Sequence, residues 1–402
     1  MGYMTTSYWQ KRGFSGVPVR PRTADTREKW DIAVIGGGLV GVATAYYLKK
    51  LGCDRVVILE KEFIGYGASG RNAGFILSGL AEPYSRLVVG MGAQSAKEIT
   101  RATLENHRLI ASAVTEKGID CGYRKCGSYH LAVGEVEKRE LEESVNLMLV
   151  DGFEVEYRSS VADSAGKSLG KYAGGFFNSA DGKIDPFAFV RGLSDGLDAV
   201  EGFEVRRILK RDGLVEIYGK HESVSAEMAV IAVNGYSPLL DSYFEELVFP
   251  VRGQMLAVLP VGGVNLGDST FYANFGYDYF RQVDDEAIIM GGLRDRFVAD
   301  EVGYDDITSP ALQSALEDYI KKNLGYKRFE VEARWGGLMG FTMDGLPLVG
   351  SLPHNSSVLA AVAFNGHGFG LGMAVARDLA AAIARNESSD LLKRFSLKRF
   401  TR

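Results

Sequence analysis

The feature that most constrains the fold is a glycine cluster between two apolar runs, in "DIAVIGGGLVGVATAYYLKKLGCDRVVILEK". An apolar run precedes Gly36, Gly38 and Gly41, a helix-like segment follows them, and a second apolar run ends on Glu60. The order of strand, glycine turn, helix and strand, with a carboxylate at its end, is typical of a domain that binds a dinucleotide.

Each glycine of this turn has its own physical reason. Gly36 permits the tight turn, Gly38 lacks the Cβ that would keep a pyrophosphate away, and Gly41 lets the helix and the strand pack closely. The phosphates are then expected on the unpaired N–H groups where the helix begins, at Leu39 and Val40.

Two further features select the dinucleotide. Glu60 follows Gly38 at about the 20-residue spacing that suits a ribose 2′-OH, which favours NAD or FAD over NADP. A second glycine turn, "NGHGFG", opens a helix near Gly368. A helix N-terminus carries about half a positive charge and favours an anion, and a reduced flavin is anionic where a reduced nicotinamide is not. We therefore predict FAD; a glycine turn without a ligand is the alternative.

Composition excludes several other classes. At 402 residues and 46% hydrophobic content, the chain can form two or three domains. A net charge of -5 gives no reason to expect nucleic acid, and no apolar run approaches the roughly 20 residues of a membrane span. Three cysteines without a C-x-x-C pair predict reduced thiols in a cytoplasmic protein. The five histidines lack metal-ligand spacing, so no metal site is expected.

Strings spread over nearly the whole chain, from Ser7 to Ala384, resemble one superfamily. It is that of the FAD-dependent amine and amino-acid oxidoreductases, with D-amino-acid oxidase, glycine oxidase and sarcosine oxidase. Within it the chain is most similar to the γ-glutamylputrescine oxidase group. The strings are "SYW", "VIGGGLVG", "IGYGASGRNAGF", "CGYRKCGSYHLAV", "IDPFAFVRGL", "AVNGYS", "YFRQVDDEAIIMGG", "RWGGLMGFTMDGLPLVG" and "NGHGFG".

The expected fold is α/β. A Rossmann-type FAD-binding domain of the glutathione-reductase-like kind is interleaved with an α+β substrate domain built on an antiparallel sheet. The expected ranges are 27–88, 166–242 and 336–395 for the discontinuous FAD-binding domain, 89–165 and 243–335 for the substrate domain, and 1–26 for an N-terminal extension.

The resemblance also implies roles in cofactor binding. Residues of the "ASGRNAGFI" string would contact phosphate or ribityl groups and run along the flavin, and the backbone near Arg206 would read the adenine. The residues expected to hold FAD are Gly36, Gly38, Leu39, Val40, Gly41, Glu60, Lys61, Ser69, Arg71, Asn72, Ala73, Gly74, Phe75, Ile76, Arg206, Asn234, Gly235, Gly337, Gly366, His367, Gly368, Phe369, Gly370, Leu371 and Gly372.

The chain departs from the amino-acid-oxidising members at two positions. Met339 and Phe369 stand where those enzymes are expected to carry arginines, and neither side chain can pair with a carboxylate as an arginine does. A small α-amino acid would lose its anchor, unless Arg252 or Arg281 supplies another. The alternative substrate is an amine recognised by apolar and aromatic surfaces.

Tyr277 and Tyr279 are expected on one face of a strand, with their rings toward the flavin. The predicted catalytic set adds Arg252, Met339, Phe369 and His367 to them. The resemblance implies that a neutral amine transfers a hydride to flavin N5 and leaves as an imine, which water hydrolyses.

The electron acceptor is less sharply defined by the sequence. Ile289 stands where sarcosine oxidase-like enzymes carry an oxygen-activating lysine, so another cation such as Arg252 would serve oxygen. "WGGLMGF" lacks the cysteine that attaches the flavin in some relatives, so FAD is expected to bind non-covalently. An amino-acid oxidase, a dehydrogenase that reduces a quinone or a carrier protein, and a non-enzymatic FAD-binding protein remain as alternatives.

Overall fold

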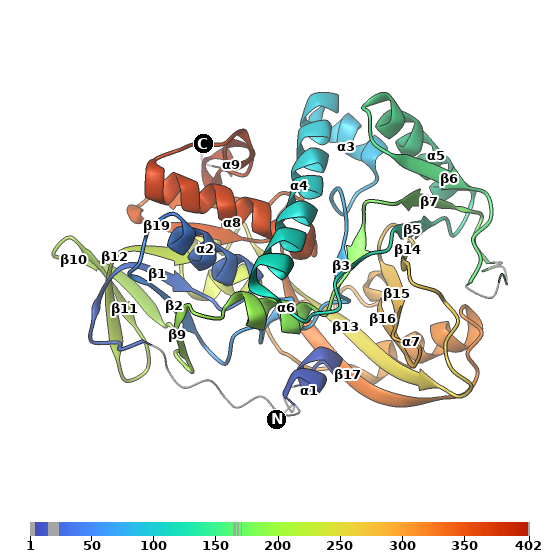
Figure 1. Cartoon of the computed structure of the whole chain (residues 1–402), viewed down its shortest axis with the longest axis horizontal. Helices are drawn as coiled ribbons and strands as arrows, with labels where there is room; N and C mark the ends of the chain where they lie inside the picture. The colour runs from blue at the N-terminus through green and yellow to red at the C-terminus, as the bar shows by residue number, and fades with distance from the viewer. Residues whose placement is uncertain (1–4, 15–23, 164–165, 167–168, 170, 401–402) are drawn as a thin grey trace.

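The computed structural model describes residues 5–14, 24–163, 166, 169 and 171–400 of the chain. Two eight-stranded sheets and a small three-stranded sheet organise these residues. The first large sheet lies on the left of Figure 1 with helices α2 and α8, and the second lies on the right. The predicted interleaving is visible along the chain, because each large sheet takes strands from separate stretches of sequence.

The centre of the first sheet is parallel. Strand β1 (Lys29–Ile35) pairs with β2 (Val56–Glu60) on one side and with β12 (Ser223–Ile231) on the other, and β9 (Asp198–Glu201) and β19 (Asn355–Val362) extend the two sides. Parallel strands covered on both faces are largely apolar, as the buried residues 56–59 of β2 illustrate. The predicted Rossmann-type domain is confirmed.

Antiparallel strands and helices complete this half. β10 (Arg207–Arg211) and β11 (Leu214–Tyr218) form a hairpin on the first part of β12, and β18 (Leu348–Leu352) pairs with β19. Helices α2 (Leu39–Lys50) and α8 (Gly368–Arg385) pack on each other over one face, and both contribute to the same hydrophobic core. Their N-termini follow the two glycine turns.

The second sheet is antiparallel except between β14 and β5, which confirms the predicted type of substrate domain. In order across the sheet its strands are β17 (Phe329–Phe341), β13 (Phe249–Pro260), β16 (Ala287–Gly292), β15 (Asp278–Val283), β14 (Thr270–Ala273), β5 (Ser128–Leu131), β7 (Gly175–Asn178) and β6 (Val155–Arg158).

The remaining elements connect and cover the two halves. Helix α4 stands between them in Figure 1 and packs against α8. The helices are α1 (Tyr8–Phe14), α3 (Tyr84–Met91), α4 (Ala93–Lys117), α5 (Glu135–Val150), α6 (Pro186–Leu193), α7 (Pro310–Lys322) and α9 (Asp390–Arg394). The small sheet contains β3 (Phe75–Ile76), β4 (Arg124–Lys125) and β8 (Gly182–Lys183), and the 3-10 turns are η1 (Ala68–Gly70), η2 (Asn234–Leu239), η3 (Ser242–Phe244), η4 (Arg294–Arg296) and η5 (Leu397–Phe400).

Two of the predicted domain limits cut through the second sheet. The range 166–242 was expected in the FAD-binding domain, yet β7 pairs with β5 and β6. The limit at 335/336 falls inside the continuous strand β17. A four-residue apolar strand such as "GFFN" carries no local signal for its sheet, because only its partners decide where it lies.

Two further properties of the described residues concern membranes and metals. None of the helices in this part of the chain combines the length and the apolar character that a membrane crossing needs. In the same residues, His, Cys, Asp and Glu side chains form no group of three or more that suits a metal ion.

Candidate cofactor and substrate site

A cavity of about 770 Å³ takes its lining from both large sheets. One end lies at the turn between β1 and α2, and the other lies among aromatic side chains of the second sheet. The turn before α8 and the segment around η1 line the part between them. The two predicted glycine turns therefore face one continuous space.

The glycines of the first turn have distinct surroundings. Gly36 has a φ of +112°, and a Cβ there would lie 2.6 Å from the Ala232 carbonyl oxygen. A Cβ on Gly41 would lie 2.0 Å from the Gly36 carbonyl oxygen. Gly38 has an ordinary φ of -79°, and its Cβ would lie 3.1 Å from Ser69 Oγ and 3.9 Å from Ser69 Cβ. The backbone itself thus requires Gly36 and Gly41, whereas Gly38 keeps the cavity open.

Glu60 lines the end of the cavity beyond this turn and is 9% exposed. Its carboxylate accepts hydrogen bonds from the backbone N–H groups of Gly37 (2.6 Å) and Glu62 (2.9 Å). Burial raises the pKa of Glu60 to about 7, although these two donors oppose the rise. Arg206 lines the same end of the cavity, and its backbone N–H donates to the Tyr218 carbonyl.

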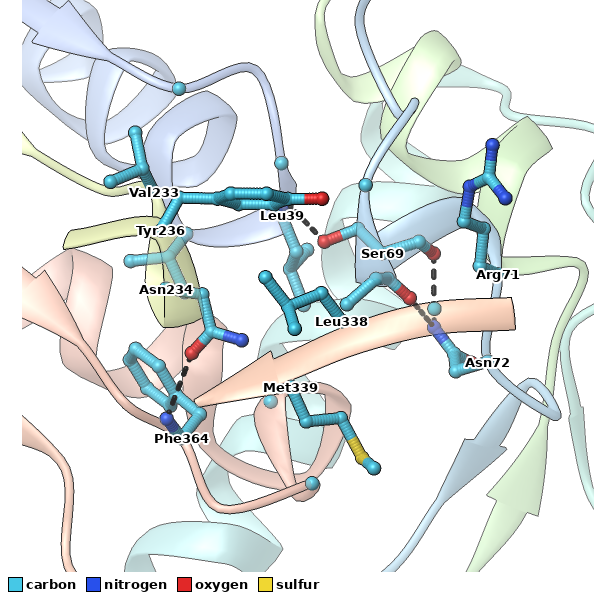
Figure 2. A pocket seen from close by; sticks show the side chains of 18 of the residues that line it. Leu39, Ser69, Arg71, Asn72, Val233, Asn234, Tyr236, Leu338, Met339 and Phe364 are labelled. Carbon is cyan, nitrogen blue, oxygen red and sulfur yellow. Dashed lines mark hydrogen bonds between the residues drawn. The ribbon is translucent and has the colours of Figure 1, made fainter. Parts of the chain in front are cut away.

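Ser69 and Asn72 fix the segment that faces the glycine turn (Figure 2). Ser69 Oγ accepts a hydrogen bond from the Leu39 N–H at 2.8 Å, which ties η1 to the start of α2. Asn72 Nδ2 donates to the Ala68 carbonyl at 2.9 Å, and its Oδ1 accepts from the Gly74 N–H at 2.7 Å. Both side chains therefore hold the backbone on which a cofactor would rest.

Arg71 lines the cavity but its guanidinium is occupied by protein groups. It forms an ion pair with Asp306 at 2.8 Å and donates to the Gly336 carbonyl at 3.0 Å. Its Nε donates to the Tyr66 carbonyl, and the guanidinium lies 4.6 Å from the centre of the Tyr66 ring. Arg71 therefore joins segments that are far apart in sequence.

The turn before α8 has an unusual backbone. Ala363 and Asn365 have φ values of 59° and 51°, a region that non-glycine residues rarely adopt, and Gly366 follows at 80°. Asn365 fixes this conformation, because its Oδ1 accepts from the Thr342 N–H at 2.8 Å and its N–H donates to the Gly340 carbonyl. Such strained backbone is characteristic of ligand sites. It directs the N-terminus of α8, at Gly368, into the cavity.

Asn234 and Met339 approach the same region from η2 and β17 (Figure 2). Asn234 Oδ1 accepts a hydrogen bond from the Phe364 N–H at 3.1 Å. A Cβ on Gly235 would lie 2.7 Å from the Met339 carbonyl oxygen, so η2 packs directly on β17. Leu338 and Met339 project from opposite faces of β17, and both line the cavity.

The aromatic end is formed by Phe75, Tyr272, Tyr279 and His367. The Tyr272 and Tyr279 rings are stacked with their centres 5.8 Å apart, and the Phe75 ring lies within 6.3 Å of both. Burial raises the pKa of both tyrosines, so both keep their protons at neutral pH. This end presents rings and hydroxyl groups.

His367 lies at this end, 6.2 Å from Tyr272 between ring centres. Its Nδ1 is 3.2 Å from the Asn365 carbonyl oxygen, and because a carbonyl only accepts, Nδ1 carries the hydrogen. Burial lowers the pKa of His367, and the charge of Arg294 lowers it further. The imidazole is therefore neutral, with Nε2 as an acceptor.

Most of the residues expected to hold FAD do line the cavity. They are Gly36, Gly38, Leu39, Val40, Glu60, Lys61, Ser69, Arg71, Asn72, Ala73, Phe75, Arg206, Asn234, Gly337, Gly366, His367, Gly368, Phe369 and Gly370.

The others of that set lie directly behind the lining. A Cβ on Gly74 would lie 2.2 Å from the Ile184 carbonyl oxygen, so this residue faces away from the cavity. A Cβ on Gly372 would contact the side chains of Leu39 and Val40. The residues outside the lining are Gly41, Gly74, Ile76, Gly235, Leu371 and Gly372.

Three of the predicted substrate residues are placed elsewhere. Tyr277 precedes β15, is 37% exposed and does not line the cavity, so it shares no strand face with Tyr279. Arg252 forms a buried ion pair with Glu301 at 2.9 Å, and Arg281 donates to the carbonyls of residues 74 and 184. Because neither arginine lines the cavity, neither is placed to bind a substrate carboxylate or to serve oxygen there.

The sequence interpretation missed Tyr272 and Arg294. Tyr272 comes from β14, where "TFYA" alternates between the two faces of the sheet. The alternation can be predicted from the sequence. Which of the two faces lies toward the cavity cannot. Arg294 follows the "GG" that ends β16, a position without a local signal.

The cavity suits FAD in shape and in chemistry. Its lining includes the Glu60 carboxylate, which suits a ribose, and the turn at Gly38, which has no Cβ to block a pyrophosphate. It also includes the N-terminus of α8 at Gly368. FAD would lie with its adenosine toward Glu60 and its isoalloxazine ring toward His367 and Tyr279.

Comparison with known proteins gives consistent findings. The family model described as FAD dependent oxidoreductase matches residues 31–382. A protein of Haemophilus influenzae named "Probable oxidoreductase OrdL" is 24% identical over 89% of this chain and 83% of its own. Gamma-glutamylputrescine oxidoreductase of Escherichia coli is 25% identical over 84% of this chain and 80% of its own.

A solved structure supports the same fold. Glycine oxidase from Geobacillus kaustophilus superimposes with a TM-score of 0.76, covering 93% of this chain and all of its own. At 23% identity this likeness concerns the arrangement of the chain.

Proposed function

Because this chain belongs to the family of FAD-dependent oxidoreductases, we propose that it oxidises a primary or secondary amine to an imine. FAD, when bound, supplies the acceptor for the hydride. The substrate C–H bond breaks with its electron pair, the nitrogen loses a proton, and the resulting C=N bond is hydrolysed by water. The wider function of an FAD-dependent oxidoreductase follows from membership itself.

The observation that carries the amine proposal is the lining at Met339 and Phe369. Both line the cavity, and neither offers a charge at the positions where the resemblance expects arginines in amino-acid oxidases. A carboxylate without a partner costs several kcal/mol to bury. Phe75, Tyr272 and Tyr279 instead surround the substrate with rings.

This environment favours the neutral form of the amine, because desolvation disfavours the ammonium. The neutral form has the free electron pair that an imine requires. His367 offers an acceptor at Nε2 for an N–H of the substrate, and the two tyrosine hydroxyls can orient the nitrogen. The N-terminus of α8 places positive potential where charge develops during the reaction.

Three further points belong to the proposal. Non-covalent FAD is part of the proposal, and it is supported by the cysteines, because Cys53, Cys121 and Cys126 are not among the residues that line the cavity and so none is placed to attach the flavin. Free thiols also favour a cytoplasmic location. Oxygen is the proposed acceptor, and an amino-acid oxidase or a dehydrogenase that uses a quinone or a carrier protein is the second candidate.

An anaerobic screen of amines and amino acids tests this function. Bleaching of the visible flavin band by amines, at rates well above those with glycine, sarcosine or D-alanine, supports it. An amine with a γ-glutamyl-polyamine-like structure belongs in the screen, given the relative named above. Faster bleaching by simple amino acids than by every amine would overturn the proposal.

Replacing Met339→Arg extends the test. Met339 is half-buried in the cavity lining, so an arginine there would bring a guanidinium to the aromatic end. We expect kcat/KM to shift from amines toward α-amino acids by about tenfold or more. An unchanged preference in a variant that retains FAD would show that Met339 does not select the substrate.

A further inference from the structure

Arg294 brings a positive charge to the aromatic end of the cavity. It begins η4, separated from the end of strand β16 by one residue, and it lines the cavity while remaining half-buried. Its guanidinium carbon lies 4.7 Å from the centre of the Tyr277 ring and 5.3 Å from the centre of the Phe341 ring. Two aromatic rings thus hold the guanidinium by contacts that leave its N–H donors unused.

No acidic side chain or carbonyl pairs with this guanidinium among the residues that the structure describes. The contrast with three other arginines is plain. Arg71 is paired with Asp306, Arg252 is paired with Glu301, and Arg281 donates to two carbonyls. A half-buried arginine with free donors that faces a ligand cavity is suited to bind an anion.

The charge of Arg294 reaches the groups of the aromatic end. It lowers the pKa of His367, and it opposes the rise that burial causes in the pKa values of Tyr272 and Tyr279. All three line the cavity. Arg294 therefore lines the same part of the cavity as the residues of the aromatic end.

The position of Phe341 indicates how far Arg294 lies from Met339 and the aromatic end. Met339 and Phe341 lie two residues apart on β17, so they share a face and are separated by about 7 Å. A Cβ on Gly253 would lie 3.0 Å from Met339 Cε and 3.6 Å from the Tyr279 hydroxyl, so Met339 belongs to the aromatic end. The Arg294 guanidinium lies over the Phe341 ring, and therefore farther from the aromatic end than Met339. It also lies beside Tyr277, which is 37% exposed.

We propose that Arg294 binds a carboxylate of the substrate, and that this carboxylate is separated from the oxidised C–N bond by several bonds. The proposal rests on the proposed amine oxidation and defines its substrate class as amines with a distant carboxylate. The proposal also explains how the site can recognise an anion although positions 339 and 369 carry no arginine. The positive charge comes from Arg294 of η4, on the solvent side of the aromatic end.

Binding measurements test the anion site without turnover. Pentanoate is titrated into the FAD-loaded protein, and its Kd is read from the change in the visible flavin spectrum, with pentanamide as the uncharged probe of equal shape. For Arg294→Gln we expect pentanoate to bind about tenfold or more weakly. Arg294→Lys should retain part of the affinity, and pentanamide should bind all proteins alike.

Arg296→Gln is the matched control, because it removes a charge from the same turn at an exposed residue outside the cavity lining. Its Kd for pentanoate should equal that of the wild type. Equal pentanoate affinity in wild type, Arg294→Gln and Arg294→Lys, all with full flavin content, would overturn the proposal.

Rates of anaerobic flavin reduction separate this inference from the function on which it rests. Wild type should be reduced faster by 5-aminopentanoate than by pentylamine, and faster than by glycine, and Arg294→Gln should abolish the advantage over pentylamine. Reduction by both amines at equal rates in both proteins would refute the carboxylate site and leave amine oxidation standing. Arg294-dependent binding of pentanoate without reduction by any amine would keep the anion site and refute the function.

Discussion

At the scale of single residues, the first glycine turn separates backbone requirements from ligand requirements. Gly36 and Gly41 would place a Cβ against carbonyl oxygens, so any side chain there disturbs the fold. Gly38 has a φ that every residue adopts, and the Ser69 side chain lies near its Cβ position. Of the three, Gly38 alone can be changed to test cofactor binding without straining the backbone.

We expect Gly38→Val to lose most of its FAD while the protein still folds. The valine side chain would fill the space in which the pyrophosphate approaches the start of α2. The measurement is the ratio of flavin absorbance to protein absorbance after purification, with the released flavin identified after denaturation. Release of FMN alone, or flavin that stays attached after unfolding, contradicts non-covalent FAD.

Gly90→Val is the control for this prediction. Gly90 is exposed on α3, and no atom lies within 4 Å of its Cβ position. The control should keep its full flavin content. Normal flavin content in Gly38→Val as well would mean that the pyrophosphate lies elsewhere.

At the scale of elements, a buried asparagine connects α4 to the helix that begins at the second glycine turn. Asn106 is fully buried; its Nδ2 donates to the Phe369 carbonyl at 2.8 Å, and its Oδ1 accepts from the N–H groups of Met373 (2.8 Å) and Ala374 (3.2 Å). A single side chain thus satisfies three backbone groups of α8 within the glycine-rich part of the helix. The orientation of the α8 N-terminus depends on this contact.

We expect Asn106→Leu to destabilise the protein by about 2 to 4 kcal/mol, because it removes three buried hydrogen bonds to the backbone of α8. FAD affinity should fall as well, since Phe369 and Gly370 line the cavity. Urea unfolding of the FAD-loaded protein gives the first quantity and flavin titration of the apoprotein gives the second.

Thr100→Val provides the comparison on the same helix. Thr100 is 1% exposed, and its hydroxyl has no hydrogen-bond partner among the residues that the structure describes. Its replacement removes a buried polar group of similar volume and should leave both measurements nearly unchanged. Equal losses in the two variants would assign the effect to general packing in α4.

At the scale of the whole molecule, the N-terminal segment links distant parts of the chain at the cavity. Trp9 of α1 is 1% exposed, and its Nε1–H donates to the Asn72 carbonyl at 2.8 Å. The Arg281 guanidinium of the second sheet lies 4.8 Å from the centre of the Trp9 ring. Gln10 donates to the Tyr66 carbonyl at 2.9 Å. Helix α1 therefore holds the segment that lines the cavity.

Trp9→Phe should weaken FAD binding several-fold with a stability loss of about 1 kcal/mol, because one hydrogen bond to the lining segment is removed. Trp30→Phe is the matched control: Trp30 also donates through Nε1, to the Asp25 carbonyl, but it lies in the core away from the cavity. Flavin titration of both apoproteins is the measurement. A similar change of FAD affinity in both variants would refute a specific role for the N-terminal segment.

The sequence by itself determined the features that depend on local chain geometry. The glycine spacings, the apolar runs and the carboxylate at Glu60 indicate backbone conformations and a strand order that any chain with this pattern must satisfy. The Rossmann-type sheet, the antiparallel second sheet and the FAD-dependent family were predictable for that reason.

Only the tertiary structure decided which polar side chains are available for chemistry. Arg252 and Arg294 are equally basic in the sequence, yet Glu301 neutralises the first and two aromatic rings leave the second open. Tyr272 faces the cavity because the neighbouring strands fix the orientation of β14, whereas Tyr277 precedes β15 and lies outside the cavity lining. Whether a charged group or a hydroxyl is free depends on partners from segments that are distant in sequence. The spacing of neighbouring residues in the sequence does not indicate which partners these are.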